Sequence, residues 1–397
     1  MIAGLAPRRA DPTARGEAHG LRFRAEIRQN IARFRAAAIA GGWDWRDLAK
    51  AASDVVSYQT ESTLAELGGI GRGAAVDEQT HLVYALVGHV VAPDECTVAA
   101  AVGDASATGQ TILLKNSDKI GADSLVGQEF HCFKEINVVV DILKENGRRI
   151  VGVAAAGTTN LKMGANDSGV VAASNIVRTT QLRMRRRGVD DLRARDRGQI
   201  LREALGQRSV AEAVRYTIEA IVDSPMATPG NLEFADADSM VVVEGSYDHL
   251  AMERIKDQVA VRSNMFALLA GLNDPQDISS PTRYERALEL LAPKAGRVTT
   301  DDLKDVSRDH ANGPGLNSIC RHSEDYHDET SLSAMIVTTD RDDPGETSLQ
   351  IALGKPCWAW DNGGVVSLKM GEPHDAIASR FLTGGAWMDF YREDARG

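Results

Sequence analysis

The most informative segment of the chain reads Pro93-Asp-Glu-Cys-Thr-Val98 and resumes, after a short gap, as Gly109-Gln-Thr-Ile-Leu-Leu-Lys-Asn-Ser-Asp118. A Cys-Thr pair opens one apolar strand, a glycine-containing turn follows, and a second strand ends in Lys-Asn-Ser-Asp. The two strands are predicted to form a hairpin. That hairpin would return Lys115 and Asp118 to the neighbourhood of Cys96.

This arrangement suits a nucleophile that is also a chain terminus. If the bond between Glu95 and Cys96 is cut, Cys96 carries both a thiol and a free α-amine. An α-amine has an intrinsic pKa of about 7.7–8.0, so it can act as the base for its own thiol near neutral pH. Asp118 is then predicted to hold the amine. Lys115 is predicted to favour the thiolate and to polarise an incoming carbonyl group.

The composition narrows the class of protein. The 397 residues include 45 Lys and Arg against 56 Asp and Glu, a net charge of −11, so neither nucleic acid nor an anionic membrane is an expected partner. The hydrophobic share of 43% excludes wholesale disorder, and the length predicts one large layered domain or two. The sequence shows no secretory signal, no run of about 18 apolar residues and no CxxC pair. We therefore expect a soluble cytoplasmic protein.

Hydrophobic periodicity predicts mainly helices before Cys96 and short strands directly after it. Residues 1–20 are polar and are expected to be frayed. The predicted helices span residues 21–38, 44–56, 78–87, 196–205, 210–222, 283–291 and 300–309. The predicted strands span residues 97–101, 111–114, 138–142, 150–155, 169–173, 239–244, 259–262, 333–338, 348–353 and 365–370. Helices and strands in separate blocks favour stacked helix and sheet layers over strict βαβ alternation.

Six further motifs accompany the hairpin: Glu66-Leu-Gly-Gly-Ile-Gly-Arg-Gly-Ala-Ala75, Gly164-Ala-Asn-Asp-Ser-Gly-Val170, Arg262-Ser-Asn-Met-Phe266, Pro281-Thr-Arg-Tyr-Glu-Arg286, Asn317-Ser-Ile-Cys-Arg-His322 and Gly354-Lys-Pro-Cys357. The hairpin pattern resembles that of cysteine N-terminal-nucleophile (Ntn) hydrolases, which include bile-salt hydrolases, acid ceramidase and the dipeptidase and secernin group. Lys-Asn-Ser-Asp is most similar to the secernin group. The six motifs, in their order, resemble the acyl-CoA:6-aminopenicillanic acid acyltransferase family.

This resemblance implies a fold and a processing event. The fold would be an α+β four-layer αββα sandwich, preceded by a mainly helical N-terminal pro-segment. Self-cleavage before Cys96 would give an α chain of residues 1–95 and a β chain of residues 96–397. Glu95 stands where the family usually shows Gly or Asp.

The resemblance also implies roles for individual residues. Asn264, with Asn175 as a second donor, would direct amide N–H groups at the oxyanion of a tetrahedral intermediate. Arg283 would pair with the Asp118 side of the site. Substrate contacts are expected from Thr97, Thr158, Thr159 and Met265. Ser263 and Met265 replace the Thr and His that the family has beside Asn264.

The implied activity is that of an amidohydrolase or acyltransferase that cleaves an amide bond of a small acylated amine or amino acid. Cys96 would form an acyl-enzyme, and hydrolysis is favoured over transfer because water needs no second binding pocket. No cofactor is required, and the only partners are the substrate and the two chains, with a homo-oligomer left open. The alternatives are a dipeptidase-like peptidase, suggested by Lys-Asn-Ser-Asp, and an uncleaved binding protein on the same fold, suggested by Glu95.

Several of these residues also have a purely structural interpretation. Asn264 suits a turn or a helix cap, Asn175 suits the end of a strand, and Arg283 suits a solvated helix face. Cys320 and Cys357, with His322, invite comparison with a zinc site. Only one short-range pair of ligands exists there, so we predict packing and no metal.

Overall fold

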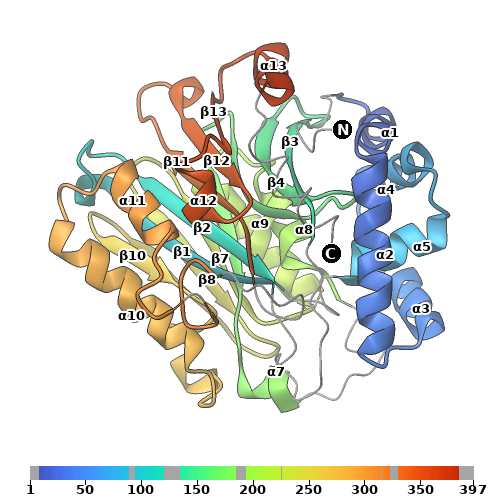
Figure 1. The fold of residues 1–397 in the computed structure, drawn as a ribbon, viewed down its shortest axis with the longest axis horizontal. Coiled ribbons are helices and arrows are strands. Elements are labelled where there is room, and N and C mark those ends of the chain that lie inside the picture. Colours follow the sequence, from blue (N-terminus) through green and yellow to red (C-terminus); the bar gives the residue numbers. More distant parts are fainter. Residues whose placement is uncertain are drawn as a thin grey trace.

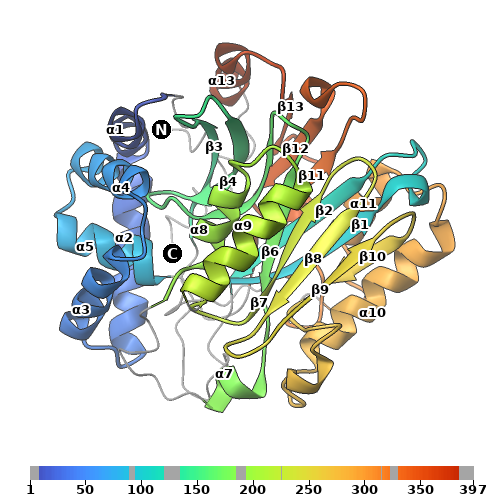
Figure 2. The same cartoon turned by 180° about the vertical axis from the view of Figure 1, so that it is seen from behind.

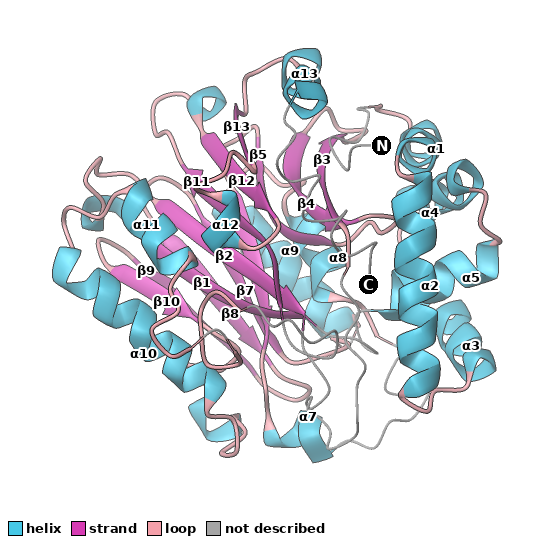
Figure 3. Ribbon diagram, viewed as in Figure 1, coloured by secondary structure: helices cyan, strands magenta, loops and turns pink. Residues whose placement is uncertain are grey.

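Two antiparallel β-sheets stack face to face, and helices cover the outer face of each sheet (Figure 1, Figure 3). The computed structural model describes residues 9–88, 94–119, 135–184, 194–224, 226–313, 315–321 and 330–383. The arrangement is an α+β sandwich, which confirms the predicted fold class.

The first sheet contains the predicted hairpin. Its strand order is β10-β1-β2-β11-β12-β13. The strands are β1 (Asp94–Ala101), β2 (Ile112–Lys119), β10 (Val259–Arg262), β11 (Thr330–Thr338), β12 (Ser348–Leu353) and β13 (Val365–Lys369). Cys96 lies opposite Ser117, and Glu95 lies opposite Asp118. In the connection between β1 and β2, Gly109 has a φ of +68°, a conformation that favours glycine.

The second sheet is a meander in which each strand pairs with its neighbour in sequence. Its strands are β3 (Asn137–Leu143), β4 (Arg149–Ala155), β5 (Leu161–Asn166), β6 (Val171–Ile176), β7 (Gly230–Ala235), β8 (Met240–Gly245) and β9 (Leu250–Ile255). The sequence patterns missed β5, β7 and β9. β5 and β7 are buried throughout but include Lys162, Asn231 and Glu233, which interrupt an apolar run. β9 is an edge strand, and most of its residues are at least partly exposed.

The outer layers differ between the two sheets. Helices α10 (Ser279–Leu291), α11 (Thr300–Ser307) and α12 (Pro356–Ala359) pack on the first sheet, whereas α8 (Arg197–Ala204) and α9 (Val210–Asp223) pack on the second. Two short helices, α7 (Thr180–Met184) and α13 (His374–Thr383), lie outside these layers.

Successive residues of β1 belong to different cores. Val98 and Ala100 join the apolar cluster that includes residues of the second sheet. Ala99 and Ala101 join the cluster beneath α10 and α11. Because side chains alternate along a strand, each β1 residue faces either the second sheet or the outer helices. This alternation determines which side chains can meet at the candidate site.

The N-terminal helices gather on one side of the sandwich (Figure 2). They are α1 (Pro12–Arg22), α2 (Arg24–Ala40), α3 (Trp45–Val56), α4 (Glu61–Ala74), α5 (Glu78–Leu82) and a π-helical turn, η1 (Val83–Val87). Mainly helical structure before Cys96 is therefore confirmed for the described residues.

The expectation that residues 1–20 are frayed is wrong from Pro12 onward. α1 packs directly on α4 through glycine, since a Cβ atom on Gly16 would lie 2.0 Å from the carbonyl oxygen of Glu66. The buried side chain of Arg15 also pairs with Glu66 at 2.6 Å. The polar composition of this segment hid the fact that its glycines and its arginine are contact residues.

Helices able to cross a lipid bilayer are not found among the described residues, because none is both long and apolar enough.

Candidate active site

Three side chains contact the main chain of Cys96, a residue that also pairs with Ser117 of β2. The pairing of β1 with β10 begins at Val98, so the N–H and C=O groups of Cys96 lie beyond that ladder. The N–H group donates to Oδ1 of Asn264 at 3.3 Å. The carbonyl oxygen accepts from Arg283 at 2.8 Å and from Nδ2 of Asn175 at 3.5 Å. Three predicted site residues therefore converge on the main chain of the predicted nucleophile.

The geometry of Asn264 differs from the predicted role. Its Nδ2 atom donates to the carbonyl oxygen of Ile176 at 2.9 Å, and its Oδ1 atom faces the nitrogen of Cys96. Asn264 thus acts here as an acceptor for Cys96 and does not present a free N–H group to it. Asn175 directs its Nδ2 atom toward the carbonyl oxygens of Cys96, Arg262 and Ser263, at 3.2 to 3.5 Å. Asn264 lies in a bend shortly after β10 and Asn175 is the penultimate residue of β6, so the turn and strand-end positions are as the structural interpretations expect.

Arg283 is completely buried, so it does not lie on a solvated helix face. Besides the Cys96 carbonyl, it donates to Oγ1 of Thr97 at 2.9 Å and to Oδ1 of Asn264 at 2.6 Å. Burial and the nearby Arg321 lower the pKa of its guanidinium to about 10, so it stays charged at neutral pH. Thr97, which was predicted to contact substrate, faces α10 and accepts from Arg283 on that helix. It does not line the pocket that contains Cys96.

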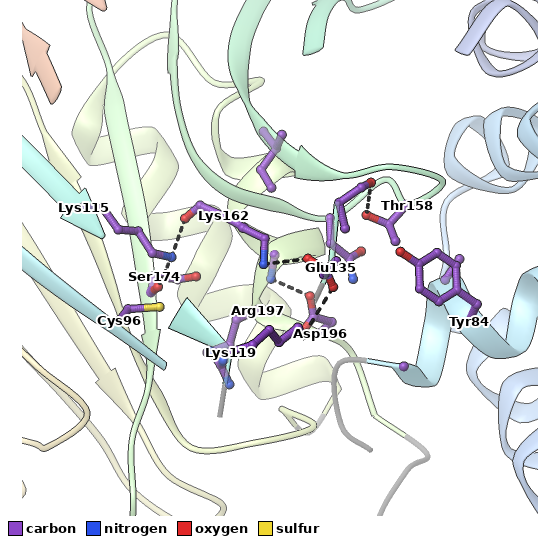
Figure 4. Close-up of a pocket in the computed structure, with 16 residues that line it drawn as sticks. Tyr84, Cys96, Lys115, Lys119, Glu135, Thr158, Lys162, Ser174, Asp196 and Arg197 are labelled. Carbon is purple, nitrogen blue, oxygen red and sulfur yellow. Dashed lines mark hydrogen bonds and ion pairs between the residues drawn. The ribbon is translucent and has the colours of Figure 1, made fainter. Parts of the chain in front are cut away.

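The Cys96 side chain, only 2% exposed, lies on the face of β1 turned toward the second sheet and lines a pocket there (Figure 4). Lys115 lines the same pocket, and its Nζ atom donates to the carbonyl oxygens of Lys162 at 2.7 Å and Ser174 at 2.5 Å. The ammonium group is therefore fixed beside the thiol by main-chain atoms of the opposite sheet. The predicted approach of Lys115 to Cys96 agrees with this geometry.

The pocket wall also contains charged residues and part of the N-terminal segment. Glu135 pairs with Lys162 at 2.9 Å and with Lys119 at 3.3 Å (Figure 4). The remaining lining residues are Tyr84, Ala85, Gly88, Ala155, Thr158, Asn160, Leu161, Asp196, Arg197 and Gly198. Among the residues predicted to contact substrate, Thr158 lines this pocket, whereas Thr159 and Met265 do not.

Glu95 points to the opposite face of the sheet and is completely buried among arginines. Its carboxylate pairs with Arg321 and Arg178, and Arg283 lies 3.6 Å from Oε2. Burial alone would raise the pKa of this carboxyl group. Arg178, Arg321 and Arg283 instead lower the pKa to about 2, so the group is ionised.

Asp118 shares the face of Glu95, because the two residues are directly opposite in the register. Its Oδ1 atom accepts from the hydroxyl of Ser331 at 2.5 Å. Burial raises the pKa of the Asp118 carboxyl to about 6 despite the opposing charge of Arg321. The hairpin thus returns Asp118 to the neighbourhood of Cys96, but the two side chains lie on opposite faces of the sheet.

Another buried acid lies between the sheets. Glu233 on β7 is completely buried, and neither of its carboxylate oxygens has a hydrogen-bond partner among the described residues. Burial raises the pKa of this carboxyl group to about 8, against the positive charges of Lys115 and Arg262. At neutral pH the group is therefore mainly protonated.

The sequence patterns did not single out several residues that shape the site: Glu135, Lys119, Lys162, Arg178, Arg197, Ser331 and Glu233. Arg321 lay inside the quoted motif Asn317–His322 but received no role. The direct continuation of Lys-Asn-Ser-Asp into Lys119 was the one local signal for a further charged pocket residue.

The structure brings Cys320 and Cys357 together with a different histidine from the one in the sequence motif. Donor atoms of His310, Cys320 and Cys357 all lie within 4.8 Å of one another. His322, considered beside the two cysteines, lies outside the described residues. The absence of a metal stays a prediction.

Comparison with known proteins gives only remote structural likenesses. No protein-family model matches the chain, and no curated protein matches it. The chain resembles a Caenorhabditis elegans N-acylethanolamine-hydrolyzing acid amidase ortholog, at 15% identity over 63% of this chain and 95% of that chain, with a TM-score of 0.42. It also resembles a mutant conjugated bile acid hydrolase from Clostridium perfringens, at 12% identity over 70% of this chain and 93% of that chain, with a TM-score of 0.43. For penicillin V acylase from Agrobacterium tumefaciens, the identity is 12% over 70% of this chain and 87% of that chain, and the TM-score is 0.39.

Proposed function

We propose that this chain is an amide hydrolase of the cysteine Ntn kind, which cuts itself between Glu95 and Cys96 and then uses Cys96 as its nucleophile. The observation that carries the proposal is the hydrogen bond from the nitrogen of Cys96 to Oδ1 of Asn264. A side-chain acceptor can keep this bond when the amide nitrogen becomes an amine, whereas a strand ladder would be disrupted. The Cys96 thiol meanwhile lines a pocket next to a fixed ammonium group.

Self-cleavage would proceed through an N-to-S acyl shift. The thiol of Cys96 attacks the carbonyl carbon of Glu95, the carbon–nitrogen bond breaks as the carbon–sulfur bond forms, and the thiol proton passes to the nitrogen. Water then hydrolyses the thioester. The products are an α chain of residues 1–95 and a β chain of residues 96–397.

Hydrolysis of a substrate would use the same atoms. The new α-amine, held by Asn264, accepts the thiol proton, and the positive charge of Lys115 favours the thiolate. The thiolate attacks the amide carbonyl of a small acylated amine or amino acid from the pocket. Asn175, whose Nδ2 atom lies 3.5 Å from the Cys96 carbonyl oxygen, is the candidate donor to the oxyanion and would exchange one of its present carbonyl acceptors for it. The amine leaves with the proton, and water resolves the acyl-enzyme.

Intact-mass spectrometry of the purified protein tests the proposal. We expect two masses, those of residues 1–95 and 96–397, and a single full-length mass for Cys96→Ala. A panel of N-acyl amino acids, acyl amines and dipeptides would then define the substrate. A wild-type chain that stays intact and hydrolyses nothing would support a binding protein instead. Two fragments from Cys96→Ala would show that a foreign protease is responsible.

A further inference from the structure

Two cysteine thiols meet on the outer face of the first sheet, away from the pocket that Cys96 lines. Cys357 is the second residue of α12, which packs on β11 and β12 (Figure 1). Cys320 belongs to the segment that precedes β11. The two sulfur atoms lie within 4.8 Å of each other, and the thiols are hydrogen-bonded. The Cys96 side chain faces the second sheet, so the first sheet separates it from this pair.

The main chain holds both cysteines in position. The N–H group of Cys320 donates to the carbonyl oxygen of Asp309 at 3.1 Å. Cys357 lies in a helical turn that the N–H group of Ala359 closes by donating to the Lys355 carbonyl oxygen at 2.9 Å. Two cysteines can form a disulfide without rearrangement of the fold only where their side chains already approach each other. The hydrogen-bonded thiols meet this condition.

The two thiols differ in exposure and in acidity. Cys320 is completely buried, whereas Cys357 is half-buried. The hydrogen bond from the Cys320 thiol lowers the pKa of the Cys357 thiol to about 7, helped by Lys355 and nearby main-chain N–H groups and opposed by burial. The same hydrogen bond, together with burial, raises the pKa of the Cys320 thiol. Cys357 is therefore the accessible thiolate, and Cys320 is a protonated thiol behind it.

We propose that Cys320 and Cys357 are a reversible dithiol–disulfide pair whose co-reactant is a low-molecular-weight disulfide. The Cys357 thiolate attacks one sulfur of that disulfide, whose S–S bond breaks, and the first small thiol leaves with the proton that Cys357 had given to water. The Cys320 sulfur then attacks the Cys357 sulfur, and the second small thiol leaves with the Cys320 proton. The two protein sulfurs lose two electrons in total, and these electrons reduce the small disulfide to two thiols. This inference goes beyond the proposed function and does not depend on it.

Thiol mapping of the full-length wild-type chain tests the pair. The protein is equilibrated without oxygen in buffers of increasing glutathione disulfide over glutathione, quenched with acid, unfolded and alkylated with iodoacetamide. Peptide mass mapping then locates each blocked cysteine. In the oxidising buffers we expect Cys320 and Cys357 to escape alkylation and to appear as one linked peptide pair. Excess glutathione should restore alkylation at both positions, because the disulfide is reversible.

Variants assign the order of attack. Cys320→Ser removes the resolving thiol, so Cys357 should keep glutathione as a stable mixed disulfide. Cys357→Ser removes the attacking thiol, so the buried Cys320 should stay reduced. Cys96→Ala is the matched control, since its side chain lies on the other face of the sheet and the link should form as in the wild type. The wild-type map decides the question even where a variant fails to fold.

Several outcomes would overturn the inference. Alkylation of both cysteines in the most oxidising buffer, or a stable glutathione adduct on Cys357 of the wild type, would show that the two sulfurs do not join. A link that excess glutathione leaves closed would make the disulfide a permanent one. A metal ion retained in the native mass of the wild type and lost in both serine variants would assign the thiols, with His310, to a metal site instead.

Discussion

The main-chain nitrogen of Cys96 lies 3.3 Å from Oδ1 of Asn264, and the partners of Asn264 fix which way its amide group points. Arg283 can only donate, and it lies 2.6 Å from the same oxygen. The Nδ2 atom has its own acceptor in the Ile176 carbonyl. Asn264 is thus an acceptor for the nitrogen of Cys96, and this orientation makes its contribution testable.

Replacing Asn264 should slow catalysis more than it weakens substrate binding. Asn264→Ala removes the acceptor that positions the base, so kcat should fall about 10²–10³-fold with little change in KM. Asn264→Asp keeps an acceptor oxygen and should retain more activity than the alanine variant. Steady-state kinetics on a hydrolysed amide measure both values. Wild-type kcat in Asn264→Ala would contradict the assignment.

Self-cleavage should depend on pH through Asp118. Its carboxyl pKa is raised to about 6 by burial, so the group loses its charge as the pH falls through that value. The neutral form cannot stabilise a nitrogen that is becoming an ammonium group, and cleavage should slow below pH 6. Asp118→Asn should be slow at every pH and should lack this step. Mass spectrometry of freshly translated chain over time gives the rates, and a flat wild-type profile would exclude the role.

The charge of Lys115 should lower the pKa of the Cys96 thiol. Lys115→Ala removes an ammonium group beside the sulfur, so the pH profile of iodoacetamide alkylation should move upward. Lys119→Ala is the control, because Lys119 lines the same pocket but is paired with Glu135. Identical shifts in both variants would indicate a general effect of pocket charge. No shift in Lys115→Ala would show that its charge does not reach the thiol.

Glu66 should fasten the N-terminal helices to the sandwich. Burial would raise the pKa of its carboxyl group, but Arg202 and Arg15 lower the pKa to about 2, below the usual glutamate value of 4.5. Its stabilisation is therefore present above pH 4.5 and is lost as the pH falls through 2. At neutral pH, Glu66→Gln should cost about 3–5 kcal/mol, seen as a lower Tm, because it removes the buried carboxylate that Arg15 and Arg202 share. Glu145→Gln, whose carboxylate is 45% exposed, should change Tm little.

The effect of Glu233 on stability should depend on pH in the opposite direction from that of Glu66. Burial raises the pKa of its carboxyl group in the folded state to about 8, from the usual glutamate value of 4.5. The buried site favours the protonated carboxyl group, so its contribution to stability is fully present below pH 4.5. This contribution is lost as the pH rises through 8. Glu233→Gln stays neutral, so this variant should melt above the wild type at pH 8 or higher and alongside it near pH 4.5. Parallel Tm curves over this range would rule out the shifted pKa.

The hairpin and the residues that it brings together could be predicted because they depend on local patterns. Apolar strands separated by a turn fix a register, and the register places Cys96 near Lys115 and Asp118. The opposite orientation of Cys96 and Asp118 also follows from strand alternation, once the pairing of Cys96 with Ser117 is known.

The group of arginines around Glu95 could not be predicted in the same way. Arg178 and Arg321 come from loops far from Cys96 in sequence, and no spacing rule connects them to Glu95. Their proximity depends on how the two sheets and the outer helices pack. The polar strands β5 and β7 were missed because Lys162 and Glu233 interrupt their apolar runs. Lys162 pairs with Glu135, whereas burial raises the pKa of the Glu233 carboxyl group to about 8.

Tyr84, Ala85 and Gly88 belong to the segment before the proposed cut, yet they form part of the pocket that Cys96 lines. Under the proposed cleavage, one polypeptide supplies the nucleophile and the other supplies part of the wall around it. The mature enzyme would then be an obligate heterodimer whose two subunits are made in equal number from one message. A β chain expressed alone from Cys96 would carry the free amine but would need the separately supplied α chain to complete its pocket.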